Sequence, residues 1–494
     1  MQADIAIEKI DEVVAQSWQA FLQYRQLPLS TRAAFMRAIA QELEDCGDAF
    51  IFTAMRETNL PEARLRGERA RTIYQLTSYA AACEKGEWLE ARIDTANPSK
   101  TPPKPDIRKM LVPLGPVVVF GASNFPFAYS TAGGDTASAF AAGCSVIVKA
   151  HPAHPDTSAI AATAISAAAE KCNLPAAIFT HVYGASFEVG KALVTHPKVK
   201  AVGFTGSYTG GKQLFDWANQ RKEPIPVFAE MSSINPVFLM PEKLQQDAAG
   251  VAQQYAGSIT LGVGQFCTNP GLLIGIESEG LQTFIHDLGK AIQQIAPAPM
   301  LHAGIVKAYK EKKGAALLQE EVHLIAESAG AVKENEALPT VATATAAAFL
   351  SNPLLHQEVF GPYSLVIRCK DMSEMIAVAQ HIEGQLTTTL MATENDITAN
   401  SALVEAVKNI CGRFVLNGVP TGVEVCLSMH HGGPFPSTTD SRFGSVGADA
   451  IKRFARPLCF QNWPNSLLPD ELKNENPLAI WRTVDNELTK AVVG

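Results

Sequence analysis

Hydrophobic positions divide the 494-residue chain into stretches with different periodicities. In residues 1–90, apolar side chains recur at helical spacing with charge on the opposite face, most clearly in STRAAFMRAIAQELEDC (30–46) and in residues 61–86. The proline-rich segment NPSKTPPKPDIRK (97–109) then interrupts the pattern. The sequence therefore predicts a helical beginning followed by an exposed arm or linker.

From residue 113, short apolar runs alternate with helical patterns. The runs are GPVVVFGA (115–122), CSVIVKA (144–150), AAIFTHVYG (176–184) and VKAVGFTGS (199–207). Apolar runs without polar alternation predict strands buried on both faces, and hence a parallel sheet covered by helices. Such a sheet places its binding loops after the carboxyl ends of its strands, here at 121–127, 149–156, 184–188 and 205–212.

A second α/β section follows residue 230. It contains a predicted helix at 243–260 and predicted strands at 269–276 and 361–369. The glycine-rich stretch 430–450 precedes a predicted final helix, and the last thirty residues are polar with scattered apolar anchors, typical of an arm. The pattern thus favours an α/β fold class with more than one domain.

Composition excludes several classes of protein. The chain carries 41 Lys and Arg against 49 Asp and Glu, a net charge of −8, with no basic run that would follow a nucleic acid backbone. The N-terminus lacks an apolar signal core, and the uncharged stretch 337–355 contains two prolines, which argues against a membrane span. Nine scattered cysteines without a C-x-x-C pair are typical of a reducing cytoplasm.

Two residues suggest acyl chemistry. Cys267 lies in GVGQFCTNPG, where flanking glycines let backbone N–H groups approach a reacting atom, as a nucleophile requires; the alternative is an ordinary loop thiol. Glu230 ends an apolar strand in IPVFAEMSSINPVF, where a general base can activate water against a thioester; the alternative is a capping or salt-bridged carboxylate.

Neighbouring loops supply further candidates. Asn124, in GASNFPF, can donate to an oxyanion, or can form a turn before Pro126. Gly206 and Gly211, in FTGSYTGG, lie at a strand-to-helix junction that resembles a phosphate loop. Lys149 ends another strand, where it can bind ribose or phosphate, or remain solvated.

The ordered motifs SNFPF, VIVKAHP, GFTGSYTGG, FAEMSSINP, GQFCTNPG and HQEVFGP together resemble the aldehyde dehydrogenase superfamily. The motifs span residues 113–362, and the flanking segments also fit, so the resemblance covers nearly the whole chain. It implies a Rossmann-type cofactor domain, an α/β catalytic domain and a β-arm for oligomerisation. By this resemblance Cys267 is the nucleophile, Glu230 the base and Asn124 the oxyanion donor, with no metal.

The resemblance also implies an NAD(P) cleft. Lys149, Ser207, Glu358 and Phe360 would line it, with Glu358 on the nicotinamide-side ribose. The family commonly has a glutamate that reads the adenosine ribose at the position of Pro152, and its absence predicts that NADP is accepted. A second departure replaces the usual Leu-Gly-Gly after the base with Met-Ser-Ser (231–233).

The resemblance implies domain boundaries as well. The NAD(P)-binding domain would comprise 1–90 and 113–229, the catalytic domain 230–430, the return to the cofactor domain 431–455, and the arm 91–112 and 456–494. Arms in this family add a strand to a partner's sheet, so we expect a homodimer or homotetramer.

Two segments, 120–144 and 431–447, are similar to the subgroup of 2,5-dioxopentanoate (α-ketoglutarate semialdehyde) dehydrogenases. The implied reaction oxidises 2,5-dioxopentanoate to 2-oxoglutarate, with Arg442 as a candidate anchor for the substrate carboxylate or as part of a salt bridge. The main alternative is a long-chain or general aldehyde dehydrogenase. In that alternative, phenylalanines would line an apolar tunnel, or would equally be ordinary core: Phe125, Phe127, Phe140 and Phe266.

Two further alternatives stay open. In one, coenzyme A takes the acyl group; Glu230 argues against it, since that route needs no water base. In the other, the chain is a non-catalytic relative; the intact set of Cys267, Glu230 and Asn124 argues against that.

Overall fold

The first sheet consists of the apolar runs that the sequence predicts to be buried. In the computed structural model, which describes residues 4–494, its five strands are parallel and run in the order β5-β4-β3-β6-β7. Their bounds are β3 Val117–Phe120, β4 Val146–Lys149, β5 Phe179–Val182, β6 Ala201–Thr205 and β7 Val227–Glu230. The α/β class is confirmed here.

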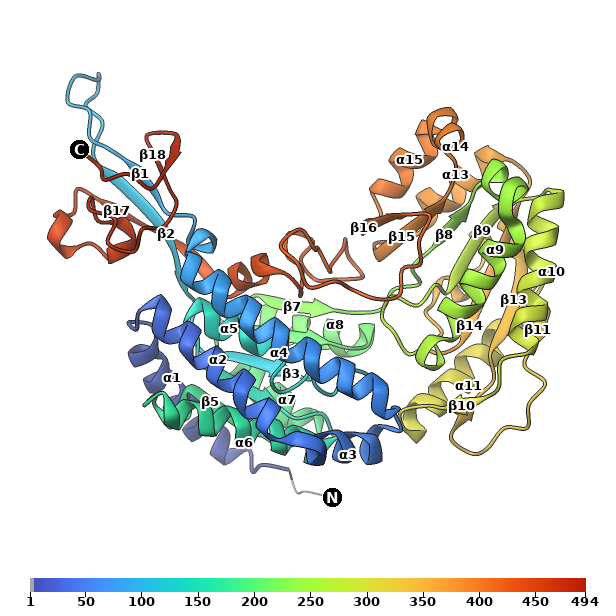
Figure 1. Ribbon diagram of the computed structural model, residues 1–494, viewed down its shortest axis with the longest axis horizontal. Helices are drawn as coiled ribbons and strands as arrows, with labels where there is room; N and C mark the ends of the chain where they lie inside the picture. Colours follow the sequence, from blue (N-terminus) through green and yellow to red (C-terminus); the bar gives the residue numbers. More distant parts are fainter. Residues whose placement is uncertain (1–3) are drawn as a thin grey trace.

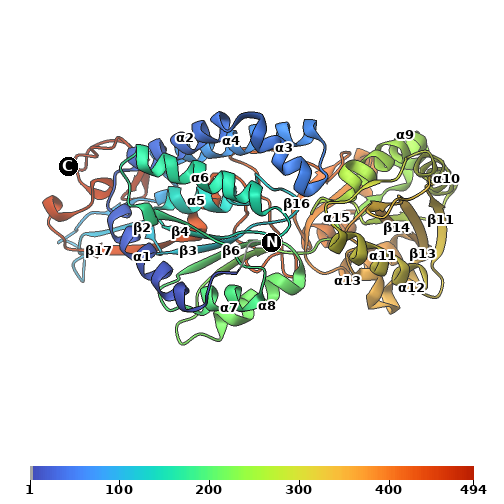
Figure 2. The same ribbon diagram turned by 90° about the horizontal axis from the view of Figure 1, so that it is seen from below.

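Helices cover both faces of this first sheet (Figures 1 and 2), which explains why its strands carry no polar alternation. One face packs against α2, α4, α5 and α6, and the other against α1, α7 and α8. The helices of this lobe are α1 Glu8–Tyr24, α2 Leu29–Asp45, α3 Gly47–Thr58, α4 Glu62–Lys85, α5 Gly134–Ala142, α6 Pro155–Lys171, α7 Phe187–Thr195 and α8 Tyr208–Asn219. The helical beginning predicted for residues 1–90 is therefore confirmed.

The second sheet forms a separate lobe, at the right of Figure 1. Its seven strands run in the order β11-β13-β14-β9-β8-β15-β16, and all are parallel to their neighbours except β11. Their bounds are β8 Val237–Leu239, β9 Leu272–Ile276, β11 His323–Glu327, β13 Thr340–Thr345, β14 Tyr363–Cys369, β15 Gln385–Met391 and β16 Cys411–Leu416. A short pair, β10 Ala298–Pro299 and β12 Glu336–Ala337, lies beside it.

Helices α9 and α10 pack on one face of the second sheet, and α11, α12, α13 and α15 on the other. The bounds are α9 Pro241–Thr260, α10 Glu279–Gln293, α11 Ala303–Leu317, α12 Ala346–Ser351, α13 Met372–His381, α14 Glu394–Ala399 and α15 Ser401–Lys408. No helix within residues 4–494 has the length and hydropathy needed to cross a membrane.

A third sheet projects from the first lobe, at the upper left of Figure 1. It joins β17-β2-β1-β18-β19, with bounds β1 Arg92–Asp94, β2 Ile107–Pro113, β17 Ala455–Gln461, β18 Arg482–Val484 and β19 Glu487–Thr489. Antiparallel pairing of β2 with β17 ties the proline-rich segment to the C-terminal region. This sheet extends from the first lobe, and its residues Ile93 and Met110 belong to that lobe's hydrophobic core.

One segment closes the site between the lobes. After β16, the chain returns along the carboxyl edge of the first sheet, where Thr438 pairs with Glu230 at the end of β7. The final helix predicted after the glycine-rich stretch is wrong as an α-helix. Ala448–Phe454 forms a 3₁₀ helix instead, because β17 begins immediately at Ala455 and leaves little room for more turns.

Candidate active site

The loop before Cys267 has an unusual backbone. Gly262, Val263 and Gly264 have φ angles of 54°, 58° and 64°, a left-handed run. A Cβ at Gly264 would lie 2.2 Å from the carbonyl oxygen of Gly361, so glycine is required there. Val263 in this conformation costs about 1–2 kcal/mol, which the surrounding contacts must offset.

Buried amide side chains hold this loop in place. Asn235 donates from Nδ2 to the carbonyl oxygens of Cys267, at 2.8 Å, and of Asn269, at 2.9 Å. Gln265 donates to the Gly262 carbonyl at 3.2 Å. These bonds fix the position of the Cys267 backbone, and with it the thiol.

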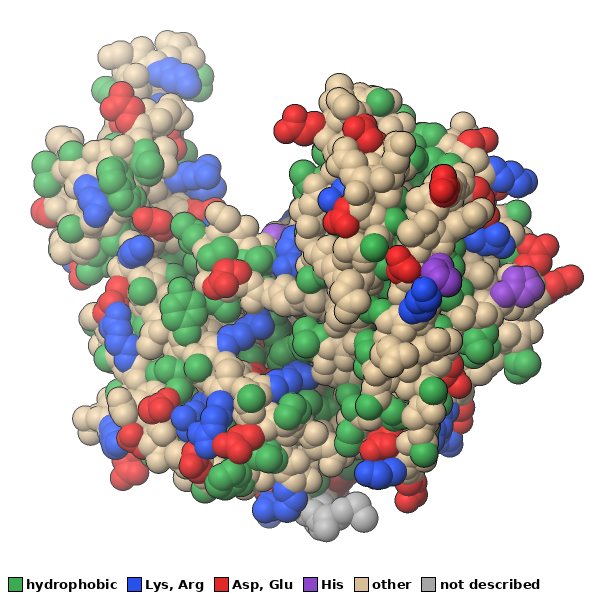
Figure 3. Space-filling model, turned by 45° about the vertical axis from the view of Figure 1, so that its right-hand side comes forward, with side chains coloured by type: hydrophobic (Ala, Val, Ile, Leu, Met, Phe, Trp, Pro, Cys, Tyr) green, Lys and Arg blue, Asp and Glu red, His purple; other side chains and the backbone are tan. Residues whose placement is uncertain are grey.

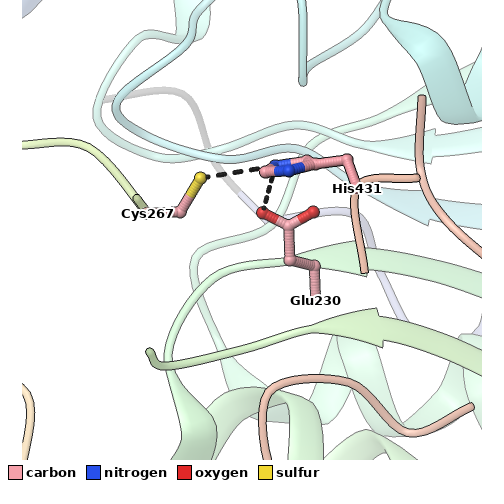
Figure 4. A group of neighbouring side chains, drawn as sticks. All are labelled: Glu230, Cys267 and His431. Atoms are coloured by element: carbon pink, nitrogen blue, oxygen red, sulfur yellow. Dashed lines mark hydrogen bonds and ion pairs between the residues drawn. The ribbon is translucent and has the colours of Figure 1, made fainter. Parts of the chain in front are cut away.

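Three side chains from distant parts of the chain meet at this thiol (Figure 4). His431 Nε2 lies 3.5 Å from Cys267 Sγ and 3.1 Å from Glu230 Oε1. The side chains of His431 and Glu230 are 1% and 3% exposed. Both contacts use Nε2, so the imidazole can take the thiol proton at that atom, beside the carboxylate. Sulfur, imidazole and carboxylate groups are also ligands of Zn²⁺. A metal ion held by these three residues would use the Cys267 sulfur as a ligand, and the thiol would then not be free to react.

The surroundings of Cys267 keep its thiol protonated. Burial raises the pKa of Cys267 well above its usual value, and the negative charges of Glu230 and Glu358 raise it further. The positive charge of Arg71 acts in the opposite direction. A neutral thiol at neutral pH requires a base beside it before it can attack a carbonyl.

Two bases lie beside the thiol, the His431 imidazole and the Glu230 carboxylate. Burial pushes the pKa of Glu230 upward, but His431, the Ser445 hydroxyl and the Cys267 thiol together hold the pKa below its usual range. Ser445 Oγ donates to Glu230 Oε2 at 2.8 Å. The carboxylate is therefore ionised at neutral pH and ready to accept a proton.

Asn124 reaches the same loop from the end of β3. Its side chain is buried, and Nδ2 donates to the carbonyl of Gln265 at 3.2 Å. Arg64 Nη2 donates to the Asn124 carbonyl at 2.7 Å and fixes its backbone. An amide carries two N–H donors, so the second can serve an oxyanion near Cys267.

The predicted cofactor residues lie along the carboxyl edge of the first sheet. Lys149 ends β4, where burial lowers its pKa and the charge of Asp4 raises it. Ser207 caps α8, and its Oγ accepts from the Gly210 N–H at 3.2 Å. A Cβ at Gly211 would lie 2.6 Å from Met231 Cγ, so glycine allows α8 to pack beside the strand end. The Gly206 N–H donates to the Glu230 carbonyl at 3.0 Å.

Glu358 and Phe360 line a pocket on the other side, together with Phe266. Burial raises the pKa of Glu358 to about 7, against hydrogen bonds with Ser232 and Ser233. Ser232 Oγ also accepts the Tyr208 N–H, at 3.2 Å, at the start of α8. Ser232, one of the two serines that depart from the family's glycines, thus connects α8 with Glu358, and the Glu358 carboxylate can accept hydrogen bonds from the hydroxyls of a ribose.

The predicted substrate residues separate into two groups. Phe125 and Phe266 have ring centroids 5.7 Å apart near Asn124 and Cys267. The other two phenylalanines of the proposed tunnel, Phe127 and Phe140, are fully buried in the core of the first lobe.

Arg442 does not stand as a free anchor. Its side chain is 76% exposed, and it forms an ion pair with Asp440 at 2.6 Å, supported by a second bond from Nε at 2.9 Å. The structure therefore corrects the anchor interpretation in favour of the alternative salt bridge, because the acid two residues away satisfies the guanidinium locally.

Comparison with known protein families identifies the family of this chain. A model described as the aldehyde dehydrogenase family matches residues 2–456. The chain belongs to the aldehyde dehydrogenase family. The predicted fold, family and activity class are confirmed, and the chain is an NAD(P)-dependent aldehyde dehydrogenase.

Two relatives of this aldehyde dehydrogenase are similar over nearly its full length. Alpha-ketoglutaric semialdehyde dehydrogenase 2 of Azospirillum brasilense is 48% identical over 98% of this chain and 92% of the relative. Alpha-ketoglutaric semialdehyde dehydrogenase of Acinetobacter baylyi is 44% identical, with the same coverage. The solved structure of glyceraldehyde-3-phosphate dehydrogenase from Methanocaldococcus jannaschii, complexed with NADP, shares the fold, with a TM-score of 0.77, 19% identity and coverage of 93% and 95%.

Sequence reasoning missed His431 in this aldehyde dehydrogenase. The histidine lies 164 positions from Cys267 and forms no spaced motif with it. Little in the sequence singles out His431, since it lies in a glycine-rich stretch and directly follows a second histidine, His430. Only the return of the chain along the end of β7 brings it to the thiol.

Proposed function

We propose that the protein oxidises 2,5-dioxopentanoate to 2-oxoglutarate with NAD(P)⁺, through a thioester on Cys267. The observation that supports this chemistry is the contact of Cys267 with His431, and of His431 with Glu230, in a buried site. The substrate is supported by the names of the two similar relatives.

The first chemical step forms the carbon–sulfur bond. His431 Nε2 takes the thiol proton, and the thiolate attacks the aldehyde carbon. The second N–H of Asn124 stabilises the oxyanion that develops. NAD(P)⁺, which Lys149, Ser207 and Glu358 would hold, would supply the acceptor for the hydride that the adduct loses in becoming a thioester.

The second step releases the acid. Glu230 takes a proton from water as the water attacks the thioester carbonyl, and Cys267 leaves as the thiolate, to which His431 returns the proton. The depressed pKa of Glu230 keeps the carboxylate in its basic form at neutral pH. This ionised base favours hydrolysis over transfer to coenzyme A.

The wild-type enzyme should prefer 2,5-dioxopentanoate over neutral aldehydes. A site that pairs with a carboxylate loses binding when the acid is missing, whereas an apolar tunnel gains about 0.8 kcal/mol with each buried methylene. We would compare kcat/KM for 2,5-dioxopentanoate, pentanal, hexanal and decanal. A steady rise toward decanal, with 2,5-dioxopentanoate poorest, contradicts the proposed substrate and favours the general aldehyde dehydrogenase.

We propose that NADP is accepted as well as NAD. Pro152 supplies no carboxylate to repel a 2′-phosphate, and Lys149 ends β4, the strand that precedes Pro152. Asp4 opposes this, since its carboxylate accepts the N–H groups of Ala185 and Ser186 and lies close enough to raise the pKa of Lys149.

Measured kcat/KM with NADP should therefore lie within roughly tenfold of that with NAD, because a surface charge changes binding by about 1 kcal/mol. The Asp4→Asn variant should shift the ratio toward NADP, and Asp11→Asn serves as a matched control in the same N-terminal region. An NADP value several orders of magnitude below that of NAD would overturn the proposal.

We also propose a division of the chain into domains. We assign cofactor binding to 1–90 and 113–229, catalysis to 230–430 and the bridging arm to 91–112 and 456–494. The third sheet, which projects from the first lobe, would provide strands for a homodimer or homotetramer. Unpaired cysteines throughout residues 4–494 are consistent with a cytoplasmic enzyme.

A further inference from the structure

Helix α4 presents a charged face to the catalytic loops. Arg64, Glu68 and Arg71 are spaced at i, i+4 and i+7, so they share one side of the helix. Glu68 Oε1 accepts the N–H groups of Phe127 at 2.8 Å and Ala128 at 3.0 Å, in the loop that begins at Asn124. The helix is thereby attached to the substrate side of the site.

Arg64 already has a structural role. Its Nη2 is bonded to the Asn124 carbonyl, and its guanidinium lies 4.8 Å from the ring centroids of both Phe125 and Phe266. The guanidinium stacks between these two rings and holds them in place beside Cys267. A nearby guanidinium in the second lobe, Arg413, is similarly engaged with the backbone carbonyls of Pro420 and Gly422.

Among the described residues, Arg71 makes a single hydrogen bond, as Arg64 does, but it does not lie between two rings. Within residues 4–494, its terminal nitrogens make one hydrogen bond, from Nη2 to the Tyr129 hydroxyl at 3.1 Å, and its buried Nε has no partner. Its guanidinium lies 5.5 Å from the Tyr129 ring centroid. The planar fork of an arginine binds a carboxylate with two parallel bonds, and such a pair is absent here.

Tyr129 connects Arg71 to the reacting atoms. Its ring centroid lies 6.2 Å from that of His431, whose Nε2 is 3.5 Å from Cys267 Sγ. The charge of Arg71 lowers the pKa of Cys267, and the charges of Cys267 and Glu230 raise the pKa of Tyr129. Arg71 and Tyr129 are therefore within electrostatic reach of the thiol.

The local charge favours an anion. One buried carboxylate, Glu68, interacts with the two guanidinium groups of Arg64 and Arg71, and burial raises the pKa of Glu68. Positive charge is thus in excess on this face of α4. Figure 3 shows Lys and Arg side chains in the depression where the two lobes meet. A carboxylate entering this side would compensate an incompletely paired cation.

We propose that Arg71, assisted by the Tyr129 hydroxyl, binds the remote carboxylate of the 2-oxo acid substrate and determines its selection over neutral aldehydes. This role rests on the proposed function, and it replaces Arg442 as the anchor. With the carboxylate held at Arg71, the short carbon chain of 2,5-dioxopentanoate can extend its aldehyde toward Cys267 between Phe125 and Phe266.

The test compares Arg71→Met and Arg71→Lys with wild type on 2,5-dioxopentanoate and pentanal, a neutral aldehyde of equal carbon number. We expect Arg71→Met to lower kcat/KM for 2,5-dioxopentanoate roughly 100-fold or more relative to kcat/KM for pentanal, because a charged partner is lost. Any effect of the lost charge on the Cys267 thiol changes both values alike and leaves their ratio unchanged. Arg71→Lys keeps the charge without the fork, so its loss should be intermediate.

Arg442→Met is the matched control, since Arg442 is exposed and paired with Asp440, and it should not change the selectivity. A second readout is inhibition by added 2-oxoglutarate, which should weaken in Arg71→Met. If Arg71→Met lowers kcat/KM equally for both substrates, or for neither, Arg71 is not the anchor. If wild type itself prefers pentanal, the proposed substrate fails first. Should Arg71→Met not fold, the Arg71→Lys and Arg71→Gln variants carry the same comparison.

Discussion

Cys267→Ala abolishes aldehyde oxidation, with kcat falling roughly 10⁴-fold or more, as expected for loss of a nucleophile that forms a covalent intermediate. The substitution removes only the sulfur from a loop whose shape is set by its glycines and by Asn235. Cofactor binding, measured by quenching of protein fluorescence, should therefore survive with a Kd close to that of wild type.

A matched control is Cys426→Ala, which removes an exposed cysteine elsewhere in the chain and should leave turnover unchanged. The main contradictory outcome is substantial turnover in purified Cys267→Ala. That result would show that the thiol in the glycine-rich loop is not the nucleophile.

Glu230→Gln should separate the two steps of the reaction. The amide keeps the shape of the side chain but cannot accept a proton from water, so thioester hydrolysis slows roughly 10²–10⁴-fold. A burst of NAD(P)H followed by a weak steady rate is the expected trace in a stopped-flow measurement.

The comparison variant is His431→Gln, in which Glu230 remains. If the imidazole mainly assists removal of the thiol proton, its loss slows the burst itself. Loss of the burst in Glu230→Gln would instead mean that Glu230 serves chiefly to activate Cys267.

Much of this architecture could be predicted because it depends on local patterns. Buried parallel strands have apolar runs without alternation, and this identified β3, β4, β5 and β6 together with the loops that follow them. Since parallel strands end at one edge, Asn124, Lys149 and Glu230 were expected to lie along the same side of the sheet. The structure places them there.

The parts that could not be predicted depend on contacts between distant segments. His431 reaches Cys267 only because the chain after β16 returns along β7. Arg71 lies on a helix whose pattern shows an amphipathic surface but not what that surface faces. Arg442 has a local partner in Asp440, two residues earlier in the chain. The resemblance of the segment does not show that this acid satisfies the guanidinium.

The backbone of the Cys267 loop is a further example. The glycines flanking Cys267 were expected to let backbone N–H groups approach a reacting atom, but Val263, between Gly262 and Gly264, also adopts a left-handed conformation. A valine rarely does so on its own, and the contact of Gly264 with Gly361 on another strand connection fixes the loop. Tertiary contacts therefore determine a conformation that local propensity disfavours.

The most direct test of the account is to identify the residue that carries the acyl group. Glu230→Gln enzyme would be mixed with cofactor and 2,5-dioxopentanoate, quenched in acid during the slow phase, digested and analysed by mass spectrometry. The account predicts a 2-oxoglutaryl thioester on the peptide that contains Cys267, absent when cofactor is omitted. An acyl group on any other residue, or an unmodified Cys267 after a full burst of NAD(P)H, would contradict it.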